Sequence, residues 1–152
     1  SFDTHTGQVA AHDRQLAELS RALGAFKADL TARGIEQDVC TLVFSEFGRR
    51  VRENGAGDTA GTDHGAGGLM LAMGSGVRGG FASEWPGCET VERTPANENQ
   101  GNLRVPTDYR SVYYSVLAEW LDEQNPQSLL GGPTIEPLVR GDGCATAKRL
   151  FK

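Results

Sequence analysis

The chain has 152 residues, enough for one domain with a hydrophobic core, and 38% of them are hydrophobic while 23% are charged. These proportions are typical of a globular protein rather than a disordered one. The formal net charge is −5 and no basic stripe is present to neutralise phosphate groups, which argues against nucleic acid as a partner. No run of about 18 apolar residues occurs, so no transmembrane helix is predicted.

The first residue is serine rather than methionine, and no signal peptide begins at Ser1. Candidate ligands start at Asp3, although chain termini tend to fray and rarely carry a functional site. We therefore expect residues 1–152 to be a single partial domain cut from a longer protein.

Apolar residues recur at three- and four-residue spacing in the first part of the chain and predict an amphipathic helix of about six turns. Gly34 is the expected residue just beyond its C-terminal end. His12 lies on the apolar stripe and is interpreted as a core histidine rather than a ligand. The stripe, interpreted as ordinary core, consists of Val9, His12, Leu16, Leu19, Leu23, Phe26 and Leu30.

A continuous apolar run at residues 39–44 follows and predicts a strand buried on both faces. A buried strand after a helix indicates an α/β fold with a parallel sheet. Residues 52–68 are rich in Gly, Asn, Asp and Thr and are interpreted as a long functional loop. Residues 69–73 are the next predicted strand.

The second half of the chain contains one clear periodic segment. An amphipathic helix is predicted from Asp108 to Leu121, with Thr107 as its N-cap and Pro126 beyond its end. Residues 74–105 read as irregular, and the tail after Gly131 shows no clear period.

The three cysteines lack the CxxC spacing of zinc or redox motifs. Cys40 lies in the apolar run and is expected to be a buried small hydrophobe. Cys88 and Cys144 lie in loop-like segments and are candidates for a disulfide if the compartment is oxidising. Their separation is not fixed by the sequence, so both the paired and the free state stay open.

The most informative run is residues 61–70, where Asp63 and His64 stand side by side in a glycine-rich segment. Such a pair is common in metal sites built from oxygen and nitrogen ligands, and also occurs as a plain loop hydrogen bond. Residues 2–5 and 44–49 have a similar character, and all three stretches flank predicted strand ends. We therefore expect Asp3, His5, Glu46 and His64 to lie within about 10 Å of one another at one edge of the sheet.

This set is the ligand inventory of a two-metal hydrolytic site. Each member also has a plainer interpretation. Asp3 fits a turn, and Glu46 fits a surface ion pair with Arg49 or Arg50. Arg49 could instead hold a substrate anion through two hydrogen bonds. Asp63 is predicted to orient His64 rather than to bind metal.

Six short motifs along the chain resemble a bacterial family called domain of unknown function 1501, which is grouped with the alkaline phosphatase superfamily. The resemblance covers nearly the whole chain and rests on the combination and order of the motifs, since each alone is weak. The motifs are Phe2-Asp3-Thr4-His5, Phe44-Ser45-Glu46-Phe47-Gly48-Arg49, Glu53-Asn54-Gly55, Gly61-Thr62-Asp63-His64-Gly65, Gly79-Gly80 and Thr107-Asp108-Tyr109-Arg110.

The resemblance implies the C-terminal portion of an alkaline-phosphatase-like parallel-sheet sandwich with helices on both faces. Asp3, His5 and His64 resemble ligands of a divalent metal such as Zn or Mn, and Glu46 resembles the aspartate of an Ala-Asp-His-Gly motif. Two departures are present: Asp3 and His5 are separated by one residue instead of three, and Phe47 replaces a histidine. The nucleophile is expected in a missing N-terminal part, so no catalytic residue is assigned here.

Two functions follow as hypotheses. The first is an exported, periplasmic or extracellular metal-dependent hydrolase, often carrying a twin-arginine signal, that acts on a small anionic phosphate or sulfate ester, with Arg49 contacting the anion. The second is a non-catalytic exported binding protein that keeps the fold with a degenerate metal site, which the loss of a histidine at Phe47 favours. A purely structural fragment is the third. The sequence leaves the substrate and the oligomeric state open.

Overall fold

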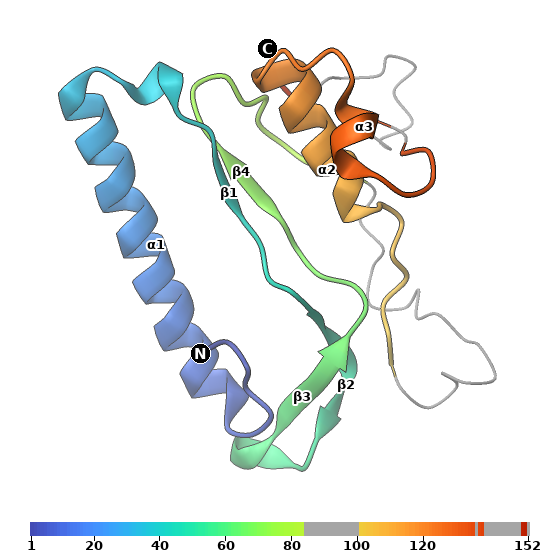
Figure 1. The fold of residues 1–152 in the computed structure, drawn as a ribbon. Helices are drawn as coiled ribbons and strands as arrows, with labels where there is room; N and C mark the ends of the chain where they lie inside the picture. The colour runs from blue at the N-terminus through green and yellow to red at the C-terminus, as the bar shows by residue number, and fades with distance from the viewer. Residues whose placement is uncertain (84–100, 136, 139–149, 152) are drawn as a thin grey trace.

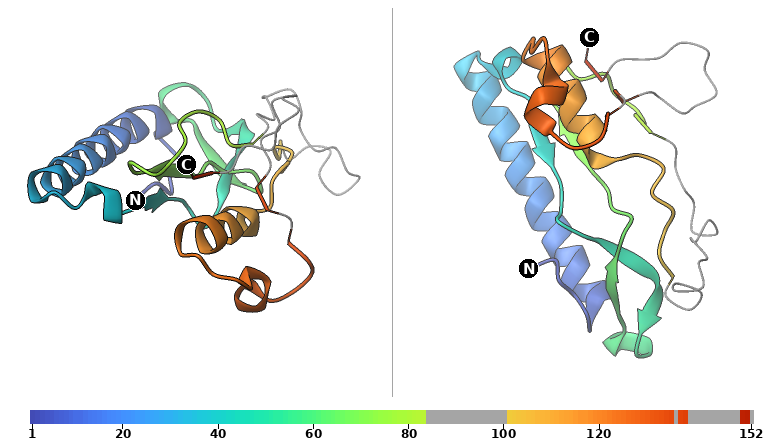
Figure 2. Two further views of the ribbon diagram at one scale, coloured as in Figure 1. Left: turned by 90° about the horizontal axis from the view of Figure 1, so that it is seen from above. Right: turned by 45° about the vertical axis from the view of Figure 1, so that its right-hand side comes forward.

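The computed structural model describes residues 1–83, 101–135, 137–138 and 150–151. The described part is a mixed α/β structure in which short strands lie between a long helix and two shorter helices (Figures 1 and 2). Cys88 and Cys144 lie outside the described residues. None of the described helices combines the length and the apolar character needed to cross a membrane.

The long helix α1 (Gln8–Arg33) confirms the periodicity prediction. It ends at Gly34, whose φ of 69° is the left-handed conformation that glycine adopts without a steric penalty. The amide of Ile35 donates to the carbonyl of Leu30 at 3.1 Å and so satisfies a carbonyl at the helix end. The predicted C-terminal glycine is therefore confirmed.

The apolar stripe of α1 is not ordinary core, and that interpretation was wrong. Leu30 is its one buried residue, while Val9, Leu16 and Phe26 are 73%, 46% and 43% exposed. Among the described elements, α1 contacts the rest chiefly at its two ends, through β3 (Gly61–Gly65) and the short helices η1 (Glu36–Asp38) and η2 (Gly57–Thr59). The periodicity therefore located the helix correctly but did not show which residues pack against its apolar stripe.

Every strand pair in the described residues is antiparallel, whereas the sequence had suggested a parallel sheet. Strand β1 (Thr41–Val43) pairs with β4 (Leu71–Met73), and β2 (Gly48–Asn54) pairs with β3. Parallel neighbours need a crossover of about a dozen residues or more, but only residues 55–60 separate β2 from β3. The short connection therefore permits only a hairpin here.

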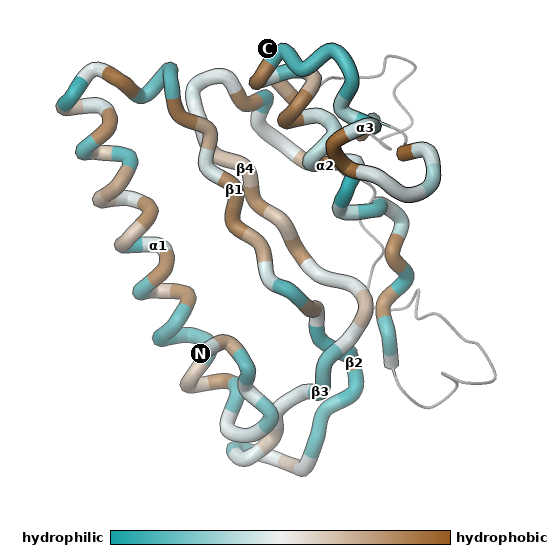
Figure 3. Tube along the Cα trace, in the orientation of Figure 1, coloured by the Kyte–Doolittle hydropathy of each residue, from teal (hydrophilic) through white to brown (hydrophobic). Residues whose placement is uncertain are grey.

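The glycine-rich segment 52–68 was predicted as a loop, but it contains the end of β2 and the whole of β3. Arg49 is the partner of His64 across the pair. The prediction failed because β2 is hydrophilic and β3 is glycine-rich, whereas β1 and β4 are apolar (Figure 3). Even β1 is only half-buried, not covered on both faces as predicted.

The main core cluster lies between the β1–β4 pair and the helical residues 109–120. Leu138, Leu150 and Phe151 are its buried members, and Trp120 packs against them with its ring centroid 5.4 Å from that of Phe151. Cys40 packs beside this cluster but is half-buried rather than fully buried as predicted, and its partial burial raises the pKa of the thiol.

The second predicted helix is present but begins and ends differently in detail. Helix α2 (Tyr109–Ser115) continues into a π-helical turn, η3 (Val116–Trp120), and Pro126 opens a separate helix, α3 (Pro126–Leu130). The N-cap is Asp108 rather than Thr107, because the Asp108 carboxylate accepts from the Arg110 amide at 2.9 Å and from its guanidinium at 2.6 Å.

Replacing Asp108 with alanine should lower the free energy of unfolding by about 1 kcal/mol at neutral pH, as typical N-cap losses do. The hydrogen bond from Arg110 lowers the pKa of Asp108 below its usual value of 3.8. The stabilisation is therefore complete above that value and disappears as the pH falls through the lowered pKa. Urea unfolding of wild type and Asp108→Ala at pH 7 and pH 2.5 should show the difference shrinking in acid. Thr107→Ala is the matched control and should change little at either pH.

Candidate metal centre

The N-terminal segment is held against β3 by backbone hydrogen bonds. The amides of Gly7 and Gln8 donate to the carbonyls of Thr59 and Ala60 at 3.0 and 2.9 Å. The amide of Thr62 donates to the carbonyl of Thr4 at 3.3 Å. The bond from Gln8 satisfies the first amide of α1, which has no side-chain N-cap, and the three bonds together place His5 beside the hairpin.

Three predicted ligands meet at this place. The Nε2 atoms of His5 and His64 lie 3.2 Å apart, and the Oδ1 atom of Asp3 lies 3.0 Å from the first and 2.8 Å from the second. All three side chains are partly open to solvent, at 44% for Asp3 and His5 and 47% for His64. Among the described residues, these three offer ligand atoms close enough to share one metal ion.

The spacing fits a common ion. Metal–nitrogen and metal–oxygen bonds of about 2.0–2.2 Å put neighbouring ligand atoms roughly 2.8–3.6 Å apart, the shorter values in octahedral and the longer in tetrahedral geometry. Two imidazoles and one carboxylate would fill one side of such an ion and leave further positions open. Sites of this composition are typically catalytic rather than closed structural ones.

Asp63 contacts and orients His5, and not His64 as predicted. Its Oδ1 atom lies 3.2 Å from Nδ1 of His5, and this contact directs the Nε2 atom of that ring toward Asp3 and His64. The Asn54 amide donates to the same carboxylate, and Arg50 lies 3.6 Å from its second oxygen. The hydrogen bond from Asn54, and less so that from His5, lowers the pKa of Asp63.

Asn54 was not identified as a site residue from the sequence. The available signal was its strand position, because Asn54 is the partner of Gly61 at the start of β3. This pairing would have been visible only once the hairpin was recognised.

The guanidinium of Arg49 makes its hydrogen bonds to other groups of the chain. Its guanidinium donates to the carbonyls of Thr62 and Phe2 at 2.6 and 2.7 Å and to the carboxylate of Asp3 at 2.8 Å. It therefore joins β3 to the N-terminal segment. The pKa of Asp3 is lowered, mainly by the hydrogen bond with His64, with His5 and Arg49 contributing.

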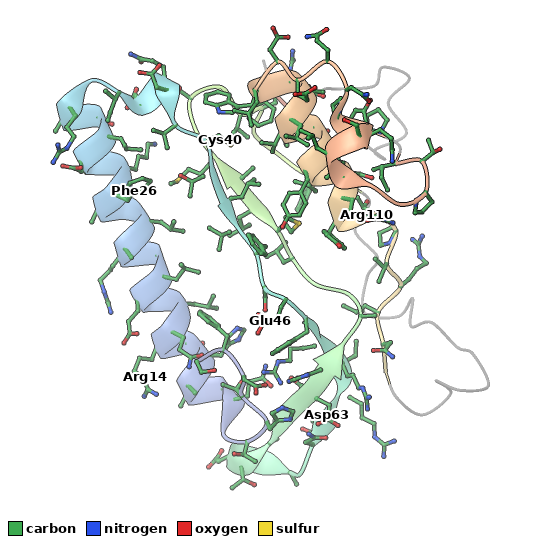
Figure 4. All side chains as sticks on the ribbon, viewed as in Figure 1. Arg14, Phe26, Cys40, Glu46, Asp63 and Arg110 are labelled. Atoms are coloured by element: carbon green, nitrogen blue, oxygen red, sulfur yellow. The ribbon has the colours of Figure 1, made fainter. Side chains whose placement is uncertain are left out.

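Glu46 is not part of the three-residue cluster. It is exposed in the connection between β1 and β2, whereas Asp63 lies on β3 (Figure 4). Its carboxylate accepts a hydrogen bond from the Ser45 hydroxyl at 3.3 Å. His12 also lies apart from the cluster: it is half-buried and meets the Phe2 ring edge-on, with the centroids 5.9 Å apart.

The fold and the cluster together define a mixed α/β protein with small antiparallel sheets and an exposed group of two imidazoles and one carboxylate. The model of the family described as "Protein of unknown function (DUF1501)" matches residues 1–120, so the chain belongs to this family. Searches of curated proteins and of solved structures each found no match. The family description gives no activity, so function has to be argued from the site.

Proposed function

We propose that Asp3, His5 and His64 bind a divalent metal ion such as Zn²⁺ or Mn²⁺ in an exported protein that hydrolyses phosphate or sulfate esters. The supporting observation is the triangle of ligand atoms with sides of 2.8, 3.0 and 3.2 Å. The orienting carboxylate of Asp63 adds to it, because histidines that bind metal usually hydrogen-bond through their other ring nitrogen.

The open side of the cluster suits an anionic ester. A bound divalent ion would polarise an ester oxygen or activate a water molecule. The three side chains would hold it near the surface, where a small substrate has access. In this proposal Glu46, in the connection between β1 and β2, belongs to a second metal position. No nucleophile is assigned to this chain.

Membership of an alkaline-phosphatase-like parallel sandwich is part of the same proposal, as is a periplasmic or extracellular location. The helices that flank the strands support the sandwich. The antiparallel strand pairs do not, because the central sheet of such a sandwich is expected to be parallel. Both parts of the proposal depend on the resemblance rather than on the cluster.

A second candidate function is a non-catalytic exported binding protein with a degenerate metal site. The specific observation in its favour is Phe47, whose ring is stacked on His64 with the centroids 3.7 Å apart. A phenylalanine offers no ligand atom at the position where the resembled motif has a histidine.

Metal titration tests the proposed site, and ester hydrolysis tests the absence of a nucleophile from this chain. The purified protein, dialysed against a chelator and reloaded with Zn²⁺ or Mn²⁺, is expected to retain one equivalent of metal by elemental mass spectrometry. The 152-residue chain should not turn over chromogenic phosphate or sulfate esters by itself. Robust turnover would contradict the absence of a nucleophile, while failure to retain any metal would remove the site.

A further inference from the structure

Both imidazoles of the cluster are contacted by residues that offer no ligand atom. The Phe47 ring lies nearly parallel to that of His64, with an angle of 13° between the planes. The guanidinium carbon of Arg49 lies 5.3 Å from the centroid of Phe47. The aromatic ring is therefore in contact with a ligand and lies close to the arginine that binds Asp3.

His5 is fixed in a different way, through its backbone. A Cβ atom placed on Gly61 would lie 2.2 Å from the carbonyl carbon of His5 and 2.3 Å from its oxygen. Real side chains do not approach backbone atoms that closely, so the segment carrying His5 can lie this near to β3 only if residue 61 is glycine. Any larger residue would push His5 away from His64.

We propose that Phe47 and Gly61 are positioning residues of the metal centre. Phe47 fixes the ring plane of His64, and Gly61 fixes the distance of the His5 backbone from β3. Together they hold the two Nε2 atoms close enough to bind one ion before it arrives. This inference rests on the proposed metal site but adds to it, because it explains affinity through two residues that do not touch the ion.

Phe47 is tested by two substitutions of different shape. Phe47→Leu keeps an apolar side chain but removes the flat ring, and should weaken Zn²⁺ or Co²⁺ binding by about 10–100-fold, the usual cost of losing a partner that orients a ligand. Phe47→Tyr keeps the ring and should restore binding close to wild type. The visible spectrum of the Co²⁺-loaded protein should change in Phe47→Leu and not in Phe47→Tyr. A purely structural role would lower thermal stability without this difference in the spectrum.

Gly61→Ala should weaken metal binding at least as much. Gly74→Ala is the matched control, since a Cβ atom there would lie 2.8 Å from the carbonyl oxygen of Val39, a backbone contact in the β1–β4 region. The control should lose stability but keep its affinity for metal. If Gly61→Ala fails to fold, the Phe47 pair still decides the question.

Different results would overturn the metal site and the positioning role of Phe47 and Gly61. Wild-type protein that binds neither Zn²⁺ nor Co²⁺ would overturn the proposed function. If the wild type binds metal, and Phe47→Leu and Gly61→Ala keep its affinity and its Co²⁺ spectrum, the positioning role is overturned. The metal site then stays in place.

Discussion

Substitution of His64 by alanine is expected to abolish metal binding while leaving the fold largely intact. His64 supplies one of three ligand atoms, so its loss should reduce affinity by more than the 10–100-fold that orienting partners contribute. Its side chain is 47% exposed, and in the metal-free protein the change should cost about 1 kcal/mol of stability or less, as most surface changes do. Elemental mass spectrometry and a thermal melt measure the two effects separately.

The control is His12→Ala, in the first turns of α1. His12 is half-buried and packs against the edge of Phe2, so its removal should lower the melting temperature and spare the metal. Unchanged metal stoichiometry in the His64 variant would remove the central ligand and leave the non-catalytic interpretation ahead.

Arg49→Ala should both destabilise the protein and impair metal binding. Its guanidinium is 19% exposed and makes three hydrogen bonds, one of them to a carboxylate. Losing such a group leaves acceptors unpaired and should cost about 3 kcal/mol, the upper part of the range for hydrogen bonds to charged groups. The N-terminal segment would then be free to carry Asp3 away from the two histidines.

Arg49→Lys should recover little of this loss, because a single ammonium cannot reproduce the planar fork of the guanidinium. Arg50→Ala is the control: Arg50 lies on the same strand and approaches Asp63 only to 3.6 Å. Urea unfolding and metal titration of the three variants are the measurements. If Arg49→Ala matches Arg50→Ala in both, Arg49 does not hold the segment, and its predicted contact with a substrate anion regains support.

The sequence predicted the elements whose signals are local. The spacing of apolar residues determined α1, and Gly34 marked its end because a left-handed residue is needed there. The antiparallel β2–β3 hairpin was missed, because β2 is rich in arginine and its sequence shows no alternation of apolar and polar residues. Burial was mispredicted for the same helix that was correctly located, because periodicity identifies an apolar face without identifying its partner.

Site prediction followed a similar division. Asp3, His5 and His64 were chosen for their chemistry and their expected places at strand ends, and the structure brings these three together. They meet through a hairpin rather than through the parallel sheet on which the expectation was based. Glu46 was included on the same assumption, but it is exposed in the connection between β1 and β2 and is not one of the three residues whose ligand atoms lie together. The partner of Asp63 depends on register, which composition does not encode.

The proposed ligands are far apart along the chain, and this separation makes the ion a cross-link. His5 and His64 are 59 residues apart, so an unfolded chain would rarely hold them together. Metal binding would therefore act on the folded state alone and add about 2.7 kcal/mol to its stability at a free metal concentration 100 times the Kd. The melting temperature of this protein would then rise with the metal concentration around it, and a chelator would lower it.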